Sequence, residues 1–583
     1  MPVPLARDSH AETRVWRLLP QAGDSPAKLT GLFGIHAAVA RVLSARGWSA
    51  DERTREFLAP DLKSIRDPFT LRDMERGVER VLQARDRGER LLVFGDYDAD
   101  GITSSAILME TLRFLKMEPE VFLPHRIDDG YGVHAGQMDD FAARGIKLIV
   151  TVDTGITAVE AIARANALGM DVVITDHHLA QAEIPAAFAV INPNLPGAEY
   201  AGGPLCGAGT AFKFAHAMLK KSGVDATTCK EFLRDLLDLV AIGTVADCVP
   251  LWGENRVFAR HGLERLAKST RPGVMALRSM AKIAETDRLT CQHVGFSLAP
   301  RINATGRLNH PEKAFELLTT RNAKRAQELA EELEQLNRDR RKEELRILEH
   351  ALLQVDALRE EHGHEHGYVV EGADYHLGVV GIVAARISEK HYRPSVVLKR
   401  EDSRMKGSAR SIPGLDVHEI ILQCGSMLTR YGGHAQAAGL ELLPEQLVPF
   451  RERFNTLCKE QFESDRAYAP TLDIDAELAP GEFGWDLQKS LQRLEPFGQD
   501  NTEPLFLMEQ VECVGAPRLV GQNHLKLNLR HGSSQFAGIG FNKGEYLPNC
   551  EHGSRVNLVV RIKENEWQGR VSLEVEIVDL RVG

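Results

Sequence analysis

Acidic side chains and imidazoles stand at the ends of three apolar segments of this sequence. RLLVFG is followed by Asp96, Asp98 and Asp100, KLIVTV is followed by Asp153, and DVVIT is followed by Asp-His-His at 176–178. Oxygen ligands with one or two imidazoles and no thiolate suit Mg²⁺ or Mn²⁺ better than Zn²⁺. Two such ions sharing one carboxylate would activate a water and stabilise the leaving oxygen of an in-line phosphoryl displacement. These residues therefore predict hydrolysis of a phosphoester or a phosphoanhydride.

The apolar segments have the pattern of buried strands, which places their ends together. Each run is short and continuous, and an amphipathic stretch such as TSSAILMETLRFLK or TAVEAIARANALG follows it. This alternation predicts βαβ units and a parallel sheet. Ligands bind beyond the carboxyl ends of the strands in such a sheet, so we expect the three ends to converge in one crevice. A further acid, Asp247, follows the apolar stretch LVAIGTVA at another break.

A single aspartate at such a position is ordinarily a turn former or a helix cap. Matching positions on three consecutive strands make that explanation insufficient. Several carboxylates in one cleft raise one another's pKa values by mutual repulsion, and divalent cations remove this conflict. The sequence thus predicts bound cations rather than a set of independent caps.

The composition indicates a folded chain of several domains with an excess of acid. Its 583 residues are 43% hydrophobic and 26% charged, which excludes a largely disordered, collagen-like or membrane-embedded protein. The net charge of −11 argues against a general polycation that coats DNA, so any nucleic-acid function needs a local basic groove or bound cations. Eight scattered cysteines without a C-x-x-C pair, with no export signal or membrane-spanning run, predict a cytoplasmic protein that does not bind membranes.

The pattern of apolar residues divides the chain into five parts. The expected fold class is α/β, with two α/β lobes joined by a long helix and followed by a small C-terminal β-barrel that resembles an oligonucleotide-binding (OB) fold. A dimeric coiled coil is the alternative for the long helix, but Arg340 interrupts its apolar stripe, and we expect a monomer. The expected parts are a helical lead-in (1–85) that packs onto the next domain, a parallel-sheet domain (86–310), the connecting helix (311–356), a smaller α/β domain (357–465) and the barrel (466–583).

Four of these motifs resemble those of the DHH phosphoesterase superfamily. They are the Asp98-Ala99-Asp100 pair, the tip VDTG at 152–155, the triplet at 176–178 and Ala246-Asp247. The longer strings VFGDYDADGITS, ITDHH, SLAPRINATGR and YGGHAQAAG are similar to the RecJ family within it, bacterial exonucleases specific for single strands. The resemblance runs through essentially the whole chain. It implies a DHH domain, a DHHA1-type domain and an OB-fold-like domain for the three larger parts.

The resemblance also implies the ligand sets. Asp98 and Asp153 hold one cation, while Asp100, Asp153, His177 and Asp247 hold the other, so Asp153 bridges the pair. Many relatives have a histidine four residues before the first aspartate of the pair, where this chain has Phe94, and we propose Asp96 as the substitute ligand. His178 is then the hydrogen-bond donor or acid beside the scissile phosphate, and Asp176 orients a neighbouring imidazole.

Substrate contacts are expected from two groups of residues. In RecJ-like proteins the segments LPHRIDDGYG and APRINATGR line the substrate path, and RMKGSARS with YGGHAQAAG resembles the substrate pocket of the DHHA1 domain. Alternating residues share one face of a strand, and backbone N–H groups near a glycine pair suit a phosphate. The candidates are Arg126, Arg301, Asn303 and Arg307 in the first group, and Arg404, Lys406, Ser408, Arg410, Gly432, Gly433 and His434 in the second.

The resemblance implies a 5′-to-3′ exonuclease that is specific for single-stranded DNA, releases 5′-mononucleotides and acts in DNA recombination and repair. A single-stranded-DNA-binding protein and a RecQ-type helicase are the implied partners. Two alternatives stay open. One is a nano-RNase, a cyclic-dinucleotide hydrolase or a pyrophosphatase on the same module, although such relatives are generally shorter and lack this barrel. The other is a catalytically dead DNA-binding scaffold, against which the retained ligands argue.

Overall fold

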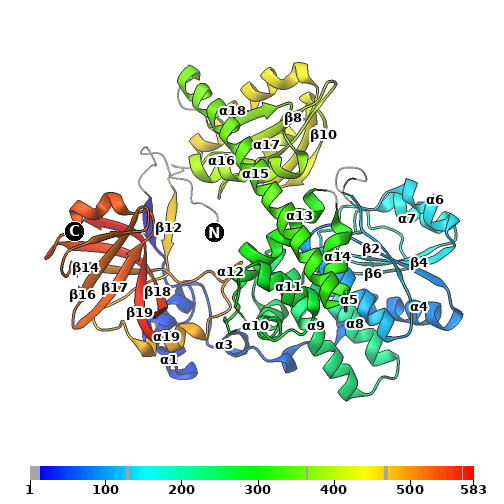
Figure 1. Cartoon of the computed structure of the whole chain (residues 1–583), viewed down its shortest axis with the longest axis horizontal. Helices are drawn as coiled ribbons and strands as arrows, with labels where there is room; N and C mark the ends of the chain where they lie inside the picture. Colours follow the sequence, from blue (N-terminus) through cyan, green and yellow to red (C-terminus); the bar gives the residue numbers. More distant parts are fainter. Residues whose placement is uncertain are drawn as a thin grey trace. The chain divides into compact units, whose positions relative to one another are not determined.

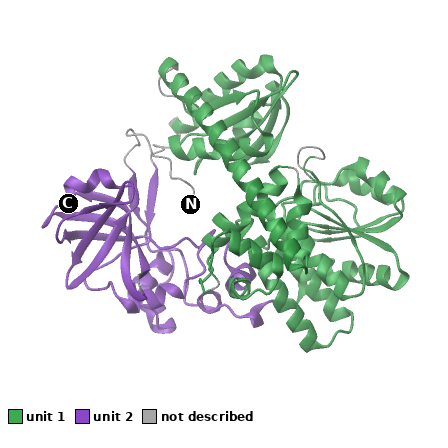
Figure 2. Cartoon of the chain, in the orientation of Figure 1, with its two compact units in different colours: residues 1–12, 66–249, 261–469 green, residues 13–65, 250–260, 470–583 purple. Residues whose placement is uncertain are grey.

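The structure is a computed structural model, which describes residues 14–125, 130, 132–198, 200–284, 286–308, 310–362, 366–464, 470–567 and 569–582. The chain forms two compact units, drawn in different colours in Figure 2. The first contains Arg66–Val249 and His261–Ala469, and the second contains Thr13–Ile65, Pro250–Arg260 and Pro470–Gly583.

A five-stranded parallel sheet is the base of the first unit (Figure 1). Helices α6 and α7 contact one face, while α4, α5 and α8 contact the other, so the apolar runs are buried on both sides as predicted. The strand order is β3-β2-β4-β5-β6, with β2 (Arg90–Gly95), β3 (Glu120–Phe122), β4 (Ile146–Val152), β5 (Asp171–Thr175) and β6 (Ala189–Ile191). The helices are α4 (Met74–Arg87), α5 (Ala99–Phe114), α6 (Ala135–Ala143), α7 (Val159–Ala167) and α8 (Gly207–Lys221).

Helices complete the first part of this unit. They are α9 (Ala226–Ala246), α10 (Gly253–Ala267, of which the residues from His261 belong to this unit), α11 (Pro272–Met280), α12 (Cys291–His293), a π-helical turn η3 (Val294–Leu298), α13 (Ala299–Arg307), α14 (Pro311–Thr319) and α15 (Ala323–His362). The predicted long helix is present as α15, but it begins at Ala323 rather than at residue 311, because Thr320 is extended and Asn322 begins the helix by accepting the N–H groups of Lys324 and Arg325. The apolar stripe of α15 packs within the chain, against α11, α13 and α14 and then against α16 and β7.

A second, mixed sheet follows α15, in the order β10-β11-β9-β8-β7. Only β7 and β8 are parallel in this sheet. Its elements are β7 (Tyr368–Gly372), α16 (Leu377–His391), β8 (Ser395–Arg400), β9 (Met405–Arg410), α17 (Val417–Gln423), β10 (Leu428–His434), β11 (Ala437–Leu442) and α18 (Leu447–Ser464). Gly432 and Gly433 lie in the edge strand β10 and not in the predicted turn, since the hairpin reverses at residues 435–436.

The second unit contains the predicted small barrel. Its strand order is β13-β14-β18-β19-β17-β16-β15, and an additional pairing of β14 with β16 closes the sheet on itself. The elements are β12 (Thr471–Ile474), β13 (Ala476–Glu477), α19 (Trp485–Gln492), β14 (Phe506–Cys513), β15 (Arg518–Val520), β16 (His524–His531), β17 (Ser534–Gly540), β18 (Arg555–Trp567) and β19 (Arg570–Val582). Short 3₁₀ turns in the chain are η1 (Leu62–Ser64), η2 (Pro68–Thr70), η4 (Gly425–Met427), η5 (Pro444–Gln446) and η6 (Gly544–Asn549).

The described part of residues 1–85 is mainly helical as predicted, but the predicted packing of this lead-in onto the next domain is wrong for its first three helices. The segment includes a strand, β1 (Val15–Leu18), which pairs with β12. Helices α1 (Pro26–Phe33), α2 (Ala37–Ala45) and α3 (Glu52–Leu58) share one hydrophobic core with the barrel strands. Only α4 packs on the parallel sheet. The apolar faces of the first three helices are therefore buried against strands that lie far away in the sequence, which no local pattern reveals.

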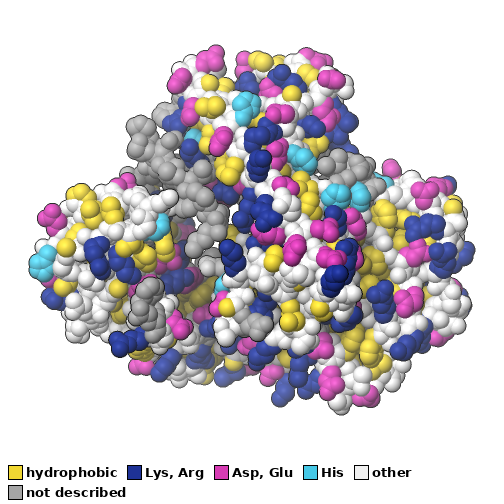
Figure 3. Space-filling view, viewed as in Figure 1, with side chains coloured by type: hydrophobic (Ala, Val, Ile, Leu, Met, Phe, Trp, Pro, Cys, Tyr) yellow, Lys and Arg dark blue, Asp and Glu magenta, His cyan; other side chains and the backbone are white. Residues whose placement is uncertain are grey.

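The surface carries charges of both signs. On the face shown in Figure 3, Lys and Arg side chains lie among Asp and Glu side chains. None of the eight cysteines, all of which lie in the described residues, forms a disulfide. Among the helices of the described ranges, none combines the length and the apolar character needed to cross a lipid bilayer.

Candidate metal centre

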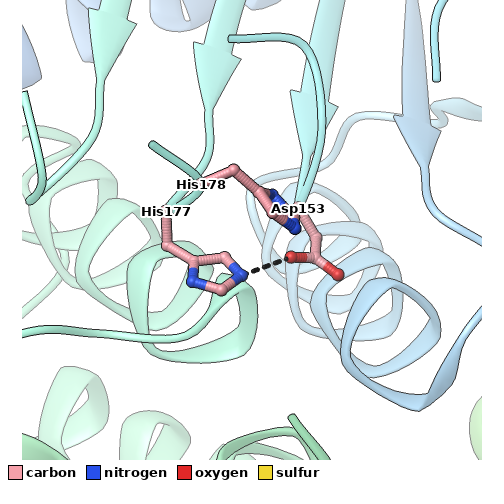
Figure 4. Close-up of side chains that lie close together, drawn as sticks. All are labelled: Asp153, His177 and His178. Carbon is pink, nitrogen blue, oxygen red and sulfur yellow. Dashed lines mark ion pairs between the residues drawn. The ribbon is translucent and has the colours of Figure 1, made fainter. Parts of the chain in front are cut away.

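The ends of β2, β4 and β5 bring the predicted acids and imidazoles together. Asp98 caps α5, since its Oδ1 accepts the N–H groups of Asp100 and Gly101 at 3.0 Å each, and this fixes the first turn of the helix at the end of β2. Asp153 follows β4 with a left-handed backbone (φ 61°), a conformation that non-glycine residues rarely adopt. His177 Nε2 lies 3.1 Å from Asp153 Oδ1, and the two side chains point toward each other (Figure 4).

All six predicted metal ligands belong to overlapping groups with suitable spacing. One group is Asp96, Asp98 and Asp153, a second is Asp100, His177 and Asp247, and a third joins Asp153 and His177 with His178. His177 Nε2 also lies 3.5 Å from Asp247 Oδ2 and 3.9 Å from Asp100 Oδ2. Asp153 is common to the first and third groups, a position that suits a carboxylate shared by two cations.

The electrostatics of these groups fit a cation. Burial and the nearby Asp98 raise the pKa of Asp100 to about 7, and burial with the Asp100 charge raises the pKa of Asp247 to about 9. Burial and neighbouring acids also hold the pKa of Asp153 well above its usual range, while burial and the adjacent His178 lower the pKa of His177 to about 4. Asp153 Oδ1 and His177 Nε2 are both buried, and although they lie 3.1 Å apart they do not form a hydrogen bond. A divalent cation would partner both atoms and favour the charged carboxylates and the neutral imidazole.

Asp176 holds the second imidazole of the triplet. Its Oδ1 lies 2.7 Å from His178 Nδ1, and its Oδ2 accepts the N–H group of Ile156 at 2.9 Å. Burial alone would lower the pKa of His178, but the hydrogen bond to Asp176 and the surrounding acids raise it to about 9. Asp176 therefore favours the protonated form of His178, which suits the role of a donor to phosphate.

Phe94 takes no part in the centre. Its ring is fully buried and lies against Phe122 and Phe141 in the core below α6 and α7. Asp96 is 5% exposed and is within reach of Asp98 and Asp153, so it is the residue placed to supply the additional ligand.

The candidate phosphate contacts beside the centre have different roles. Arg126 lies outside the described residues. Arg301 does not fit the prediction, because its guanidinium donates to Glu334, to the carbonyl of Ser297 and to that of Met280, so it braces α13 against its neighbours. Asn303 accepts the N–H group of Ala99 at 2.7 Å. Arg307 donates to the carbonyl of Gly378 at the beginning of α16, between the two lobes.

Four candidates of the second sheet share one face, namely Ser408, Arg410, Gly432 and His434. The register places Ser408 beside Gly439 and Gly439 beside Gly432, and the next row joins Arg410, Ala437 and His434. Gly432 and Gly439 have open space where a side chain would be, so the packing of the protein does not require glycine there. Two basic residues of the group have acidic partners, Arg404 with Glu401 and Lys406 with Glu441, and Gly433 points to the opposite face.

The sequence did not predict a role for two glycines whose small size the packing beside the candidate ligands requires. A Cβ at Gly207 would lie 2.6 Å from the Asp153 side chain, and one at Gly243 would lie 2.5 Å from Asp100 Oδ1. The N–H groups of Gly207 and Ala208 donate to the carboxylate of Asp100 at 2.7 and 2.9 Å. The glycines of CGAGTAF and AIGTVAD at the ends of helices were the available signal, but only the fold shows what they touch.

Comparison with known proteins agrees with this arrangement. The chain matches the DHH family N-terminal domain over residues 90–244, the DHHA1 domain over 365–460 and the RecJ OB domain over 474–579. It is 36% identical over 573 residues to the single-stranded-DNA-specific exonuclease RecJ of Bacillus subtilis, covering 97% of this chain and 71% of that protein. It is 34% identical to RecJ of Escherichia coli, with 96% and 97% covered. The chain belongs to the RecJ family.

Solved RecJ structures have the same fold. The crystal structure of RecJ in complex with Mn²⁺ from Thermus thermophilus superposes with a TM-score of 0.81 and 28% identity, covering 98% of this chain and 80% of that one. A second crystal structure of the same RecJ is in complex with Mg²⁺. The RecJ match thus extends through both lobes and the barrel. The nano-RNases, cyclic-dinucleotide hydrolases and pyrophosphatases considered above generally lack such a barrel.

Proposed function

We propose that this chain hydrolyses single-stranded DNA from the 5′ end and releases 5′-mononucleotides with the help of two divalent cations, Mn²⁺ or Mg²⁺. The observation that carries the proposal is the meeting of six buried or half-buried ligands around Asp153 in a RecJ-family chain. The chemistry that such a centre supports is phosphodiester hydrolysis, and the family name gives single-stranded DNA as the substrate.

The ligands divide the work of the centre. When bound, the cations supply a nucleophile at neutral pH and neutralise charge on the phosphate. Asp96 and Asp98 would hold one cation, and Asp100, His177 and Asp247 would hold the other, with Asp153 shared between them. Asp98 also caps α5, so the helix fixes one of the ligands independently of the metal.

His178 is the proposed proton donor. Its Nδ1 is committed to Asp176, which leaves Nε2 as the nitrogen that reaches a substrate. A protonated imidazole at this position would donate to a phosphate oxygen or to the leaving oxygen of the scissile bond. Asp176 fixes the orientation of the ring and favours its charged form.

The second sheet is the proposed site for the 5′ end. Ser408, Arg410, Gly432 and His434 would contact phosphate from the open glycine face, and Arg404, Lys406 and Gly433 stay in the proposal as outer contacts. Asn303 and Arg307 would line the path from this face to the centre, since they lie on the helix that touches both α5 and α16. The barrel would hold the part of the strand that has not yet entered the centre, by stacking and backbone contacts.

The domain limits and cellular role stay part of this proposal. From family membership we propose a role in recombination and repair, with a single-stranded-DNA-binding protein and a RecQ-type helicase as partners, and a monomeric state. The eight free cysteines support a reducing, cytoplasmic location. The nuclease would consist of residues 86–310 and 357–465 with the connecting helix, and the barrel would begin near residue 466.

Digestion of end-labelled strands tests the proposal. With Mn²⁺ present, label at the 5′ end should appear at once as mononucleotide, while label at the 3′ end should appear last. Immediate release from the 3′ end alone would overturn the polarity. Asp153→Ala should reduce cleavage by at least roughly 100-fold while strand binding persists. Asp139→Ala, which removes an exposed acid that pairs with Arg164, is the matched control and should retain activity.

A further inference from the structure

The backbone of the His177-His178 dipeptide is held by side chains rather than by secondary structure. The dipeptide lies in the loop after β5, outside any helix or strand. Its two N–H groups donate to Asp176 Oδ1 at 2.7 and 3.1 Å. Its two carbonyls accept from side-chain amides: Asn194 Nδ2 donates to the carbonyl of His177, and Asn192 Nδ2 donates to that of His178 at 2.9 Å. All four backbone polar groups of the imidazole pair therefore have side-chain partners.

The two asparagines come from the next strand of the sheet. β6 pairs with β5 so that Ile191 lies beside Thr175, and Asn192 and Asn194 follow in the turn of the sequence INPN. The same rule that gathers the acids at the strand ends thus places two amides behind the imidazoles. Asn192 is 1% exposed, and its Oδ1 accepts the N–H group of Asn194 at 2.7 Å, so it fixes the turn as well as the loop.

An asparagine after a strand is ordinarily a turn former. The hydrogen bond from the Asn194 N–H group to Asn192 Oδ1 is sufficient to form that turn. The amide N–H groups of both residues add nothing to their own turn, because they reach across to the loop that carries the imidazoles. A ring on a loop is oriented only as well as its backbone is held, and metal or substrate contacts tolerate deviations of about 0.5 Å. The two amide bonds therefore act on the position of His177 and His178.

We propose that Asn192 and Asn194 are positioning residues of the metal centre: their amides lock the backbone from which His177 reaches the cation and His178 reaches the phosphate. The inference rests on the proposed function, since it assigns a purpose to the loop of that same site. It assigns no contact with substrate to either asparagine.

Asn194→Asp is the variant of choice. Asn194 is half-buried, and aspartate keeps its shape while removing both N–H donors. Mn²⁺ affinity, measured from the electron paramagnetic resonance signal of the free ion, should weaken by about 10–100-fold, with a similar fall in kcat. KM for DNA and the melting temperature should stay near those of the wild type. Asn192→Asp should act in the same direction, with an additional loss of stability because the residue is buried.

Asn166→Asp is the matched control, because Asn166 Nδ2 also donates to a backbone carbonyl, that of Ala186 at 2.8 Å, but on the surface away from the centre. It should leave Mn²⁺ affinity and kcat unchanged. If Asn194→Asp binds Mn²⁺ and turns over like the wild type, the positioning role is refuted. If it loses activity only in proportion to its melting temperature, the role is structural and the inference also fails. A wild-type protein that binds Mn²⁺ but does not digest DNA would instead overturn the proposed function.

Discussion

Replacement of Gly207 by alanine tests whether the position of Asp153 sets the activity. A Cβ at residue 207 would lie 2.6 Å from Cβ, Cγ and Oδ1 of Asp153. Carbon atoms in favourable contact are about 3.5–4.0 Å apart, so one side must move by roughly 1 Å. The substitution therefore changes the geometry of the proposed metal ligand Asp153 by a known steric displacement.

The displacement should fall on Asp153 rather than on α8. The first turn of α8 is buried and its N–H groups at Gly207 and Ala208 bind the carboxylate of Asp100, so moving the helix would disturb a second ligand. An error of about 1 Å in a catalytic group typically costs about 100-fold in rate. Overpacking of this kind costs about 1–3 kcal/mol in the free energy of unfolding. We expect Gly207→Ala to fold, with a rate that falls more than its stability.

The assay is the initial rate of digestion of a 5′-labelled single strand as a function of Mn²⁺ concentration, alongside a urea unfolding curve. Gly209→Ala is the matched control in the same helix, because a Cβ there meets Leu205 Cβ at 3.4 Å, which needs only slight adjustment. It should retain nearly wild-type activity. A Gly207→Ala protein with the rate and Mn²⁺ dependence of the wild type would refute the reasoning, and equal losses in both variants would indicate general damage to α8.

Three further substitutions test the electrostatics. Asp176→Asn should move the alkaline limb of the kcat–pH profile to lower pH, since the pKa of His178 would fall from about 9 to about 6.5 or below. At a pH of about 8 the protonated fraction of His178 would then drop about 30-fold, and activity should recover near pH 6. An unchanged pH profile would contradict this. Burial, with Lys213 and Lys220 nearby, lowers the pKa of His216 to about 4, so its neutral form favours folding and stability falls as pH drops through 6.5 toward 4. His216→Asn should remove about 2 kcal/mol of that loss at pH 5 relative to pH 8 in urea unfolding, and identical pH dependence in both proteins would disprove it. Arg271→Met should lower the free energy of unfolding by about 3–5 kcal/mol, because the buried guanidinium pairs with Glu110 and Asp238. A loss of about 1 kcal/mol or less, the value of an exposed ion pair, would argue against this network.

Local pattern was sufficient to predict the parallel sheet and the meeting of acids and imidazoles at its strand ends. Continuous apolar runs identify strands that are buried on both faces, and the topology of a parallel sheet then brings their ends together. The positions of Asp98, Asp153 and His177 follow from those two facts alone. Asn322 is a helix-capping residue type and could have predicted the break between α14 and α15, but the long charged helical pattern around it suggested one continuous helix.

Other features depend on partners that are distant in sequence. Arg301 and Arg307 stand six residues apart in one motif, yet Arg301 binds Glu334 and two carbonyls, while Arg307 reaches Gly378. Nothing in their own segment distinguishes them. Glycine weakens strands in general, so Gly432 and Gly433 suggest a turn, whereas the structure places both in an edge strand. The left-handed backbone of Asp153 is equally invisible, because it is a conformation that the surrounding sheet imposes.

The structure shows where some of the acids behind the net charge of −11 lie. Acids at positions 96, 98, 100, 153, 176 and 247 gather around two imidazoles, and burial with mutual repulsion raises the pKa values of Asp100, Asp153 and Asp247. On the surface, acids such as Glu334 and Glu316 already pair with arginines. Part of the negative charge is thus concentrated at the centre itself. Two divalent cations would contribute +4 against these six carboxylates and so offset most of their charge, which would lower the repulsion that a phosphate meets at this site.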